Sequence, residues 1–178
     1  MDTADLEARR ARFDIVVREL VEPLRRSMAR RTDPATADDV LGDTLLVLWR
    51  RYDELPAEPL PFAYGVARLC LANAERGARR QRRLAGRIAT LDPPSQAPEP
   101  VGDDRLGDAL ASLTAEDTEL LRLWAWERLS PREIATVLDV TTNAAAIRLH
   151  RARGRLREKL RKVERPAGHE GADEGRRP

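Results

Sequence analysis

The chain has little with which to build a metal site or a disulfide: it contains one cysteine and two histidines in 178 residues. Cys70 has no second cysteine to pair with, which excludes both an intramolecular disulfide and a Cys-rich zinc module. The two histidines, His150 and His169, lie far apart and have no carboxylate or cysteine neighbours at ligand spacing. We therefore expect no metal site.

Aromatic residues are also scarce, at 4% of the chain, and most of the apolar mass comes from leucine and alanine. This composition favours small helical bundles over a β-sandwich or a large α/β sheet. A chain of this length forms one ordinary domain or two small ones. The sequence therefore predicts an all-α fold.

Long hydrophobic runs are missing as well. No apolar stretch is long enough to span a membrane, and the N-terminus has no charged segment followed by an apolar one, as a signal peptide would have. We expect a cytoplasmic protein that does not insert into a membrane.

The net charge of +2 conceals a strong segregation of charge along the chain. Residues 61–92 carry seven basic and two acidic side chains, and residues 105–163 carry twelve basic and eight acidic ones. Residues 1–60 are acidic on balance, with ten basic and thirteen acidic side chains. Positive charge is thus concentrated in two places, and both are candidates for contact with an anionic partner.

Two segments lack the apolar periodicity of the rest. The first, "LDPPSQAPEPVGDD" at residues 91–104, is rich in proline and acids and is typical of a linker. The second, residues 164–178, has almost no large apolar residue and is expected to be disordered. The remaining segments, residues 1–90 and 105–163, are each long enough for a small helical domain.

In the first domain we expect three helices. The first runs through "FDIVVRELVEPLRRSMARR", where Pro23 kinks or divides it. The second starts near Thr36, with Asp39 completing a weak capping box, and stops before Pro56. The third runs from about Phe62 to Arg83, after a proline-rich loop.

The second domain begins with a short helix in "RLGDALASL", followed by a helix that opens at Thr114 with acidic residues in its first turn. The next helix has a strong start: Ser130 is its expected N-cap, Pro131 takes the first helical position and Glu133 closes a capping box.

After a short turn at Asp139, Thr141 or Thr142 caps the last helix, which carries eight basic side chains and one acidic one between residues 143 and 162. Two short helices joined by a tight turn, the second of them basic, describe a helix-turn-helix.

The last helix has two distinct faces when its residues are placed about 100° apart. One narrow stripe is apolar and is expected to face the core: Ala145, Leu149, Ala152 and Leu156. The opposite side carries Asn143, Ile147, His150 and Arg151, with Ala146 and Arg148 on its flanks. These six residues are here called the recognition face. Short side chains near a helix N-terminus let the backbone approach a major groove closely, and arginines hold phosphates. A merely solvated basic helix is the alternative.

The third helix carries a second basic surface. Four arginines, here called the arginine rail, line up within about 80° of arc opposite its apolar side: Arg68, Arg76, Arg79 and Arg83. Such a rail suits a sugar-phosphate backbone, although salt bridges to the acidic first helix are an alternative. Phe62, at the start of this helix, either stacks on an unpaired base or fills the small core.

The second helix has a mixed acidic and apolar face, here called the acidic-apolar face. Its members are Asp39, Gly42, Asp43, Leu46 and Arg50. An exposed leucine among acids is poorly suited to DNA and better suited to a protein partner, while an ordinary solvated face remains the alternative.

Taken in order, "DDVLGDTLLVLWRRY", "PFAYGVARLCLANAERGARRQRR", the acidic proline-rich linker and "LSPREIATVLDVTTNAAAIRLHRARGRLREKL" resemble the extracytoplasmic-function sigma factors of bacterial RNA polymerase. The resemblance covers nearly all of residues 10–161 and is most specific in the last block. It implies a domain similar to sigma region 2, a domain similar to region 4, no cofactor and no enzymatic activity. The partners it implies are core RNA polymerase, promoter DNA and, in many members, an anti-sigma factor.

The resemblance also implies a different role for each surface. The acidic-apolar face would dock on the clamp helices of the polymerase, and region 4 would meet the flap. Phe62, Asn73, Arg76, Arg79 and Arg80 fall where region 2 reads the −10 element, and the recognition face falls where region 4 reads the −35 element.

Some positions depart from the family's frequent residues. Arg128 and Asp139 stand where glycine is common, although Asp tolerates a left-handed turn well enough for the turn to survive. Ala144 and Ala146 replace a frequent Thr and Lys, so a promoter preference is not carried over. Two other functions compete with a sigma subunit: a stand-alone helix-turn-helix regulator of duplex DNA, and a protein-interaction adaptor.

Overall fold

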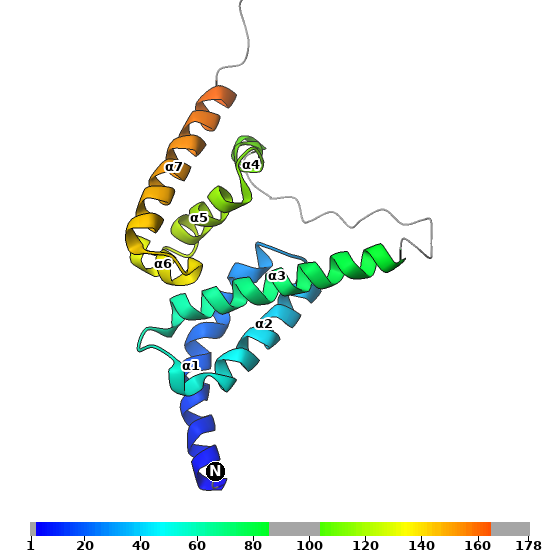
Figure 1. Cartoon of the computed structure of the whole chain (residues 1–178), viewed down its shortest axis with the longest axis vertical. Helices are drawn as coiled ribbons and strands as arrows, with labels where there is room; N and C mark the ends of the chain where they lie inside the picture. Colours follow the sequence, from blue (N-terminus) through cyan, green and yellow to red (C-terminus); the bar gives the residue numbers. More distant parts are fainter. Residues whose placement is uncertain (1–2, 86–103, 165–178) are drawn as a thin grey trace, which may run out of the picture.

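The computed structural model describes residues 3–85 and 104–164, and every regular element in these residues is a helix (Figure 1). The elements are α1 (Thr3–Ala29), α2 (Pro34–Arg50), the short 3₁₀ helix η1 (Tyr52–Glu54), α3 (Pro59–Ala85), α4 (Asp104–Ala111), α5 (Ala115–Ala125), α6 (Pro131–Leu138) and α7 (Thr142–Glu164). The expected all-α class is confirmed within this part of the chain. Nearly all of the expected linker, and all but the first residue of the expected tail, lie outside the described residues.

Helix α1 is one continuous helix and does not divide at Pro23. It continues because Leu20 and Leu24, on either side of the proline, are fully buried against the rest of the bundle. Tertiary burial of this kind outweighs the local cost of a proline in a helix interior.

Helix α1 also starts ten residues earlier than the apolar pattern predicts. Arg9 explains the extension. Its guanidinium donates to the backbone carbonyl oxygen of Trp49 at 3.2 Å and lies 4.8 Å from the centre of the Trp49 ring. It also forms an ion pair with Asp53 at 3.2 Å. These contacts join the first turns of α1 to the end of α2, forty residues away, where a local pattern gives no sign of them.

The predicted N-cap of α2, Thr36, is wrong, although the helix starts within two residues of it. The N-cap is Asp33, whose carboxylate accepts the Thr36 amide proton at 3.0 Å, and Pro34 takes the first helical position. Hydrogen bonding from the backbone and side chain of Thr36 lowers the pKa of Asp33. An Asp-Pro pair supplies a charged acceptor and a pre-set backbone angle together, so it is a better start signal than a Thr three residues later.

The first three helices form a bundle whose core is mostly leucine and other aliphatic side chains. Its fully buried members include Leu20, Leu24, Met28, Val40, Leu48, Ala63 and Ala67. Phe13 closes the bundle at one end, with its ring edge-on to Trp49 and Tyr52 at centroid distances of 5.2 and 5.7 Å.

Helices α4 to α7 form a second unit, in which α4, α5 and α6 all pack against α7. The buried members of this core include Leu120, Leu123, Leu129, Ile134, Val137, Ala145, Leu149 and Ala152. The small side chains on α7 allow the short α6 to lie close to it, as a helix-turn-helix requires.

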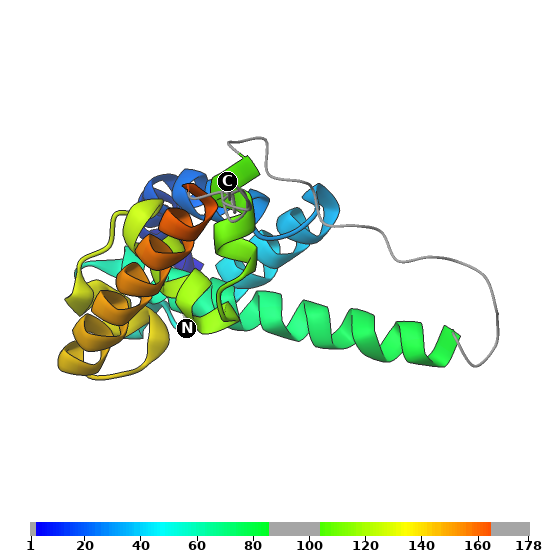
Figure 2. The same cartoon turned by 90° about the horizontal axis from the view of Figure 1, so that it is seen from above.

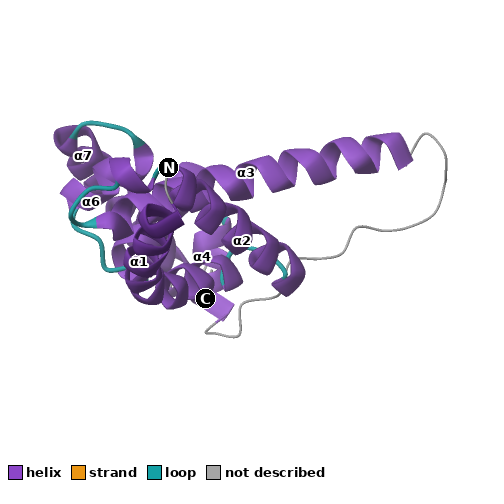
Figure 3. Cartoon of the chain, turned by 90° about the horizontal axis from the view of Figure 1, so that it is seen from below, coloured by secondary structure: helices purple, strands orange, loops and turns teal. Residues whose placement is uncertain are grey.

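The two units touch where α6 packs against the N-terminal half of α3 (Figure 1). Gly65 of α3 makes the approach close, because a Cβ atom at this position would lie 3.3 Å from the carbonyl oxygen of Val137. The C-terminal half of α3 projects from the body of the molecule (Figure 2). Seen from below, the projection carries the end of α3 clear of every other helix (Figure 3).

Candidate nucleic-acid and partner surfaces

The helix-turn-helix begins with the capping box that the sequence predicts. The Ser130 hydroxyl accepts the Glu133 amide proton at 3.3 Å, and the Glu133 carboxylate accepts the Ser130 amide proton at 2.8 Å. Hydrogen bonds from Ser130 lower the pKa of Glu133. Thr141, rather than Thr142, caps α7 by accepting the Ala144 amide proton at 3.2 Å.

The tight turn depends on a left-handed residue. Asp139 has a φ of 52°, and the Val140 amide donates to the Ala135 carbonyl at 3.0 Å, as in a Schellman helix end. The expected survival of the turn with Asp is confirmed. Arg128, before α6, also has a positive φ, of 56°, so both positions where glycine is common in the family adopt the backbone that glycine favours.

Helix α7 is held to α5 by apolar burial and by one ion pair. The Asp117 carboxylate, with a side chain only 6% exposed, accepts two hydrogen bonds from Arg155 at 2.5 and 2.6 Å. These bonds outweigh the effect of burial, so the pKa of Asp117 lies below its ordinary value. Arg153 stacks 4.4 Å from the ring centre of Trp124. Two arginines of the basic run are therefore structural.

The recognition face stays open to solvent. Five of its side chains are exposed, among them Ile147 at 44%, and Ala146 is half-buried. The same helix buries Ala145, Leu149 and Ala152 on its other side, as its periodicity predicts. The N-terminal turns of α7 thus present small, apolar and basic groups together, as major-groove reading requires.

The arginine rail is mostly exposed. Asn73 and the arginines at positions 76, 79, 80 and 83 all face solvent on α3. Arg76 donates to Asn73, and Arg79 lies 3.7 Å from Glu75 on the same helix. Among the described residues no ion pair joins the rail to α1, so the alternative of salt bridges to that helix receives no support.

The N-terminal end of α3 is more enclosed. Arg68 is half-buried, and its Nε atom has no hydrogen-bond partner among the described residues. Phe62 is half-buried against the core, with the Arg51 guanidinium 5.2 Å from its ring centre. Its ring thus packs on the core while part of it remains accessible.

The acidic-apolar face lies on α2, is called the α2 face from here on, and is exposed along its length. Asp39, Asp43 and Arg50 face solvent, and Leu46 is 46% exposed between them. The opposite side of α2 buries Val40, Leu41, Thr44 and Leu48. A large apolar side chain among exposed charges matches the expected surface for a protein partner.

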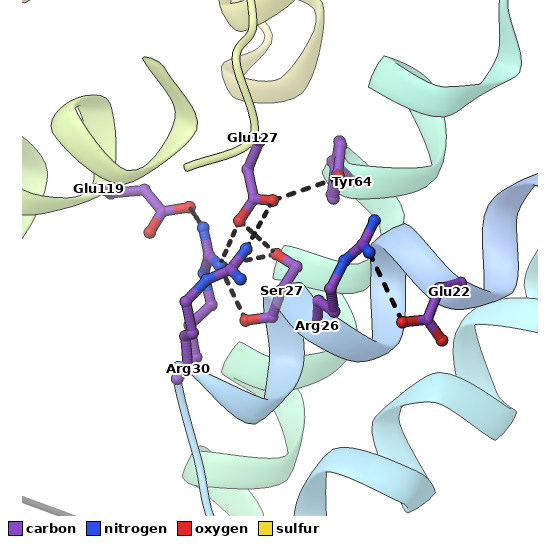
Figure 4. A network of polar contacts seen from close by, with 8 residues as sticks. Glu22, Arg26, Ser27, Arg30, Tyr64, Glu119 and Glu127 are labelled. Carbon is purple, nitrogen blue, oxygen red and sulfur yellow. Dashed lines mark hydrogen bonds and ion pairs between the residues drawn. The ribbon is translucent and has the colours of Figure 1, made fainter. Parts of the chain in front are cut away.

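Sequence reasoning missed one polar cluster, centred on Glu127 in the loop between α5 and α6 (Figure 4). One carboxylate oxygen accepts hydrogen bonds from Ser27 at 2.9 Å and Arg31 at 3.0 Å. The other accepts them from Arg30 at 2.9 Å and Tyr64 at 3.3 Å. No local pattern in "WERLS" indicates partners that lie 63 to 100 residues away.

The Glu127 cluster is tightly enclosed and charged. The side chain of Glu127 is 3% exposed and that of Arg31 is 6% exposed. Burial alone would raise the pKa of Glu127, but hydrogen bonds from Arg31, Arg30 and Ser27 outweigh it and hold the pKa below its ordinary value. Arg31 also contacts Glu119 of α5 at 3.3 Å. The carboxylate is thus a stable anion in a site lined by arginines.

Two further observations concern the described residues alone. None of their helices is both long and apolar enough to cross a membrane. In the same part of the chain, no three His, Cys, Asp or Glu side chains come together in a group able to hold a metal ion.

Comparison with known proteins agrees with this geometry. The family described as sigma-70, region 4 matches residues 103–156. An RNA polymerase sigma-E factor of Streptomyces avermitilis is 30% identical over 158 residues, covering 83% of this chain and 84% of the relative. The ECF RNA polymerase sigma factor SigL of Mycobacterium tuberculosis is 30% identical over 138 residues, covering 74% of this chain and 78% of the relative.

A solved structure shares the fold. The sigma factor RpoE of Bartonella quintana, crystallised in complex with the anti-sigma factor NepR, superposes with a TM-score of 0.61 and 21% identity. The match covers 86% of this chain and 98% of that one.

The helix-turn-helix and the matched region 4 define a DNA-binding unit of the sigma-70 class. The full-length relatives extend the match across both units, and the chain belongs to the extracytoplasmic-function sigma factor family. It is a sigma subunit that directs transcription initiation by RNA polymerase. A stand-alone regulator is not favoured, because the relatives match the α1–α3 unit as well as the helix-turn-helix.

Proposed function

We propose that the two units share the reading of a promoter, with α7 on the −35 element and α3 on the −10 element, while α2 docks on core polymerase. The observation that carries this proposal is the combination, in one chain, of an exposed recognition face with an exposed arginine rail on a separate unit. The unit limits proposed are residues 1–90 and 105–163, joined by the linker at 91–104 and followed by the tail at 164–178. The chain itself performs no catalytic step.

On α7, the small residues near the N-terminus let the helix backbone come close to base edges. Ile147, 44% exposed, suits contact with a thymine methyl group, and Asn143 and His150 are polar and exposed beside it. Arg148 and Arg151 suit phosphates or guanine edges. Arg153 and Arg155, engaged by Trp124 and Asp117, are assigned to the fold and not to DNA.

On α3, the projecting half presents Asn73, Arg76, Arg79, Arg80 and Arg83 to solvent (Figure 2). This arrangement supplies a row of positive charge that follows a strand backbone. Phe62, partly accessible at the start of the helix, supplies a ring on which an unpaired base stacks.

On α2, Asp39, Asp43, Leu46 and Arg50 form the surface for the clamp helices of core polymerase, and the second unit meets the flap. An anti-sigma factor is a further expected partner, since the structural neighbour RpoE was solved with one.

The test is transcription in vitro from pooled genomic DNA of the encoding organism, with core polymerase in the presence and absence of the chain. We expect the chain to direct initiation at a small set of sites. Replacing Arg148 and Arg151 together by alanine should reduce this initiation at least tenfold, because each arginine supplies one or more contacts of about 1–3 kcal/mol.

The same Arg148/Arg151 variant should still bind core polymerase, measured by co-purification with it. Arg153→Ala is the matched control, since this arginine stacks on Trp124 and is not assigned to DNA. Loss of core binding in the Arg148/Arg151 variant, or tight binding of the chain alone to an operator with no effect on core polymerase, would show that the assignment is wrong.

A further inference from the structure

The partners of the Glu127 carboxylate belong entirely to the other unit. Ser27, Arg30 and Arg31 lie on or just after α1, and Tyr64 lies on α3, whereas Glu127 follows α5. A buried carboxylate needs full hydrogen bonding to remain charged, and here every such bond crosses the boundary between the units (Figure 4). The cluster therefore stabilises the closed arrangement specifically and does little for either unit alone.

Aromatic contacts lie beside the same boundary. Trp126 is 43% exposed, and its ring lies 5.5 Å from the Arg30 guanidinium and 5.7 Å from that of Arg122. Arg122 is half-buried, with an Nε atom that has no hydrogen-bond partner among the described residues. Two acids, Glu119 and Glu127, thus lie near three arginines, at positions 30, 31 and 122. Neutralising one acid therefore leaves an excess of positive charge at this boundary.

The closed arrangement covers part of the surface proposed for the −10 element. At about 100° per residue, Gly65 falls within the same sector of α3 as the arginine rail. The backbone of α6 occupies this position, with the carbonyl oxygen of Val137 placed 3.3 Å from where a Gly65 Cβ would be. A strand that runs along the rail therefore meets α6 near the half-buried Arg68, whereas the rail from Arg76 to Arg83 stays open to solvent.

We propose that the free chain inhibits itself: the buried Glu127 holds α6 over the N-terminal end of the arginine rail, and promoter reading requires this contact to break. This inference rests on the proposed function of α3. When the units separate, water hydrates both Glu127 and the arginines, so the open state loses little. Removing the carboxylate charge penalises only the closed state, in which Arg31 stays buried with Glu119 as its remaining acid.

The first experiment measures closure without polymerase or DNA. Probes on cysteines introduced at the exposed positions Arg18 and Arg157, in a Cys70→Ser background, report the distance between α1 and α7 by energy transfer. We expect Glu127→Gln to lower the transfer efficiency clearly, and Glu116→Gln, an exposed acid on α5, to leave it unchanged.

A second variant distinguishes separation of the two units from unfolding of the chain. Gly65→Leu places a side chain against the α6 backbone, while a leucine in α3 is favourable for the helix itself. It should lower the transfer efficiency with the helical circular dichroism retained. If neither variant changes the efficiency, the proposal is overturned.

The second experiment measures access to the rail. A fluorescein-labelled single-stranded 20-mer of mixed sequence at low salt serves as the probe, since the rail binds through phosphates. We expect Glu127→Gln to bind it about tenfold more tightly than Glu116→Gln, which removes the same charge, because in the opened chain the strand also reaches Arg68 and Phe62. An opened variant with unchanged affinity would overturn the inhibitory role. Failure of the proposed function itself would appear separately, as no initiation with core polymerase.

Discussion

Two side chains in the second unit hold a backbone conformation that suits glycine. Arg128 and Asp139 have φ angles of 56° and 52°. For a residue with a Cβ this conformation costs about 1 kcal/mol or more, and Asp tolerates it better than Arg does. The side chain of Arg128 is exposed, so its removal leaves no cavity.

We therefore expect Arg128→Gly to raise the free energy of unfolding by about 0.5–1 kcal/mol, part of the relief being offset by the greater freedom of glycine in the unfolded chain. Asp139→Gly should raise the free energy of unfolding by less, because Asp tolerates the left-handed conformation better than Arg does. Urea denaturation measures both, with Arg157→Gly in the exposed middle of α7 as the matched control, expected to lose about 1 kcal/mol. Destabilisation by Arg128→Gly would mean that its side chain contributes to the fold.

Single residues were predictable where their partners are near in sequence. Ser130 and Glu133 cap each other three residues apart, and Thr114 accepts the Asp117 amide proton at 3.2 Å, so local patterns suffice. Glu127 was not predictable, because its partners come from α1 and α3 and no spacing encodes them.

At the scale of helices, Asp117 and Arg155 join α5 to α7 and so orient the recognition face from behind. The pKa of Asp117 is lowered in the folded chain, mainly by its hydrogen bonds from Arg155. The stability from this pair is therefore fully present above the unfolded pKa of about 3.9 and is lost as the pH falls through the folded value.

We expect Asp117→Asn to lower the free energy of unfolding by about 1 kcal/mol at pH 7, toward the low end for a charged hydrogen bond because Arg155 is half exposed. The variant should also lose less stability than the unsubstituted chain as the pH falls from about 4 through the lowered folded pKa of Asp117. Urea titrations at several pH values check both, with the exposed Asp108→Asn as control. An unchanged pH profile would contradict the assigned role.

Local sequence patterns predict the buried face of a helix better than they predict its ends. The apolar stripe of α7 predicts its buried residues correctly, because one face of one helix determines them. The early start of α1 depends on Arg9 meeting Trp49 and Asp53, and its passage through Pro23 depends on the burial of its neighbours. Both are tertiary effects that override local preference.

At the scale of the whole molecule, the α2 face and the closure of the units are compatible. Asp43 and Leu46 are exposed in the closed arrangement, so the docking surface proposed for core polymerase is accessible before α6 leaves α3. Binding energy at α2 is then available to favour the open state, if core polymerase binds that state more tightly.

We expect replacement of Asp43 and Leu46 together by lysine to weaken binding to core polymerase at least tenfold, through loss of apolar contact and reversal of charge. The energy-transfer distance between the units should stay the same in this free variant. Fluorescence anisotropy with labelled chain measures the affinity, and Glu19→Lys on the exposed side of α1 controls for charge alone. Normal core binding by the double variant would remove α2 as the docking surface.

Gly65 links closure to the thermodynamics of α3 itself. In a helix interior, glycine costs about 1 kcal/mol relative to alanine, and contact with the α6 backbone compensates for this only while the units are closed. After separation, the turn of α3 next to Phe62 keeps the cost without the compensation. In the open state proposed above, the residue that permits close packing therefore weakens the turn of α3 next to Phe62.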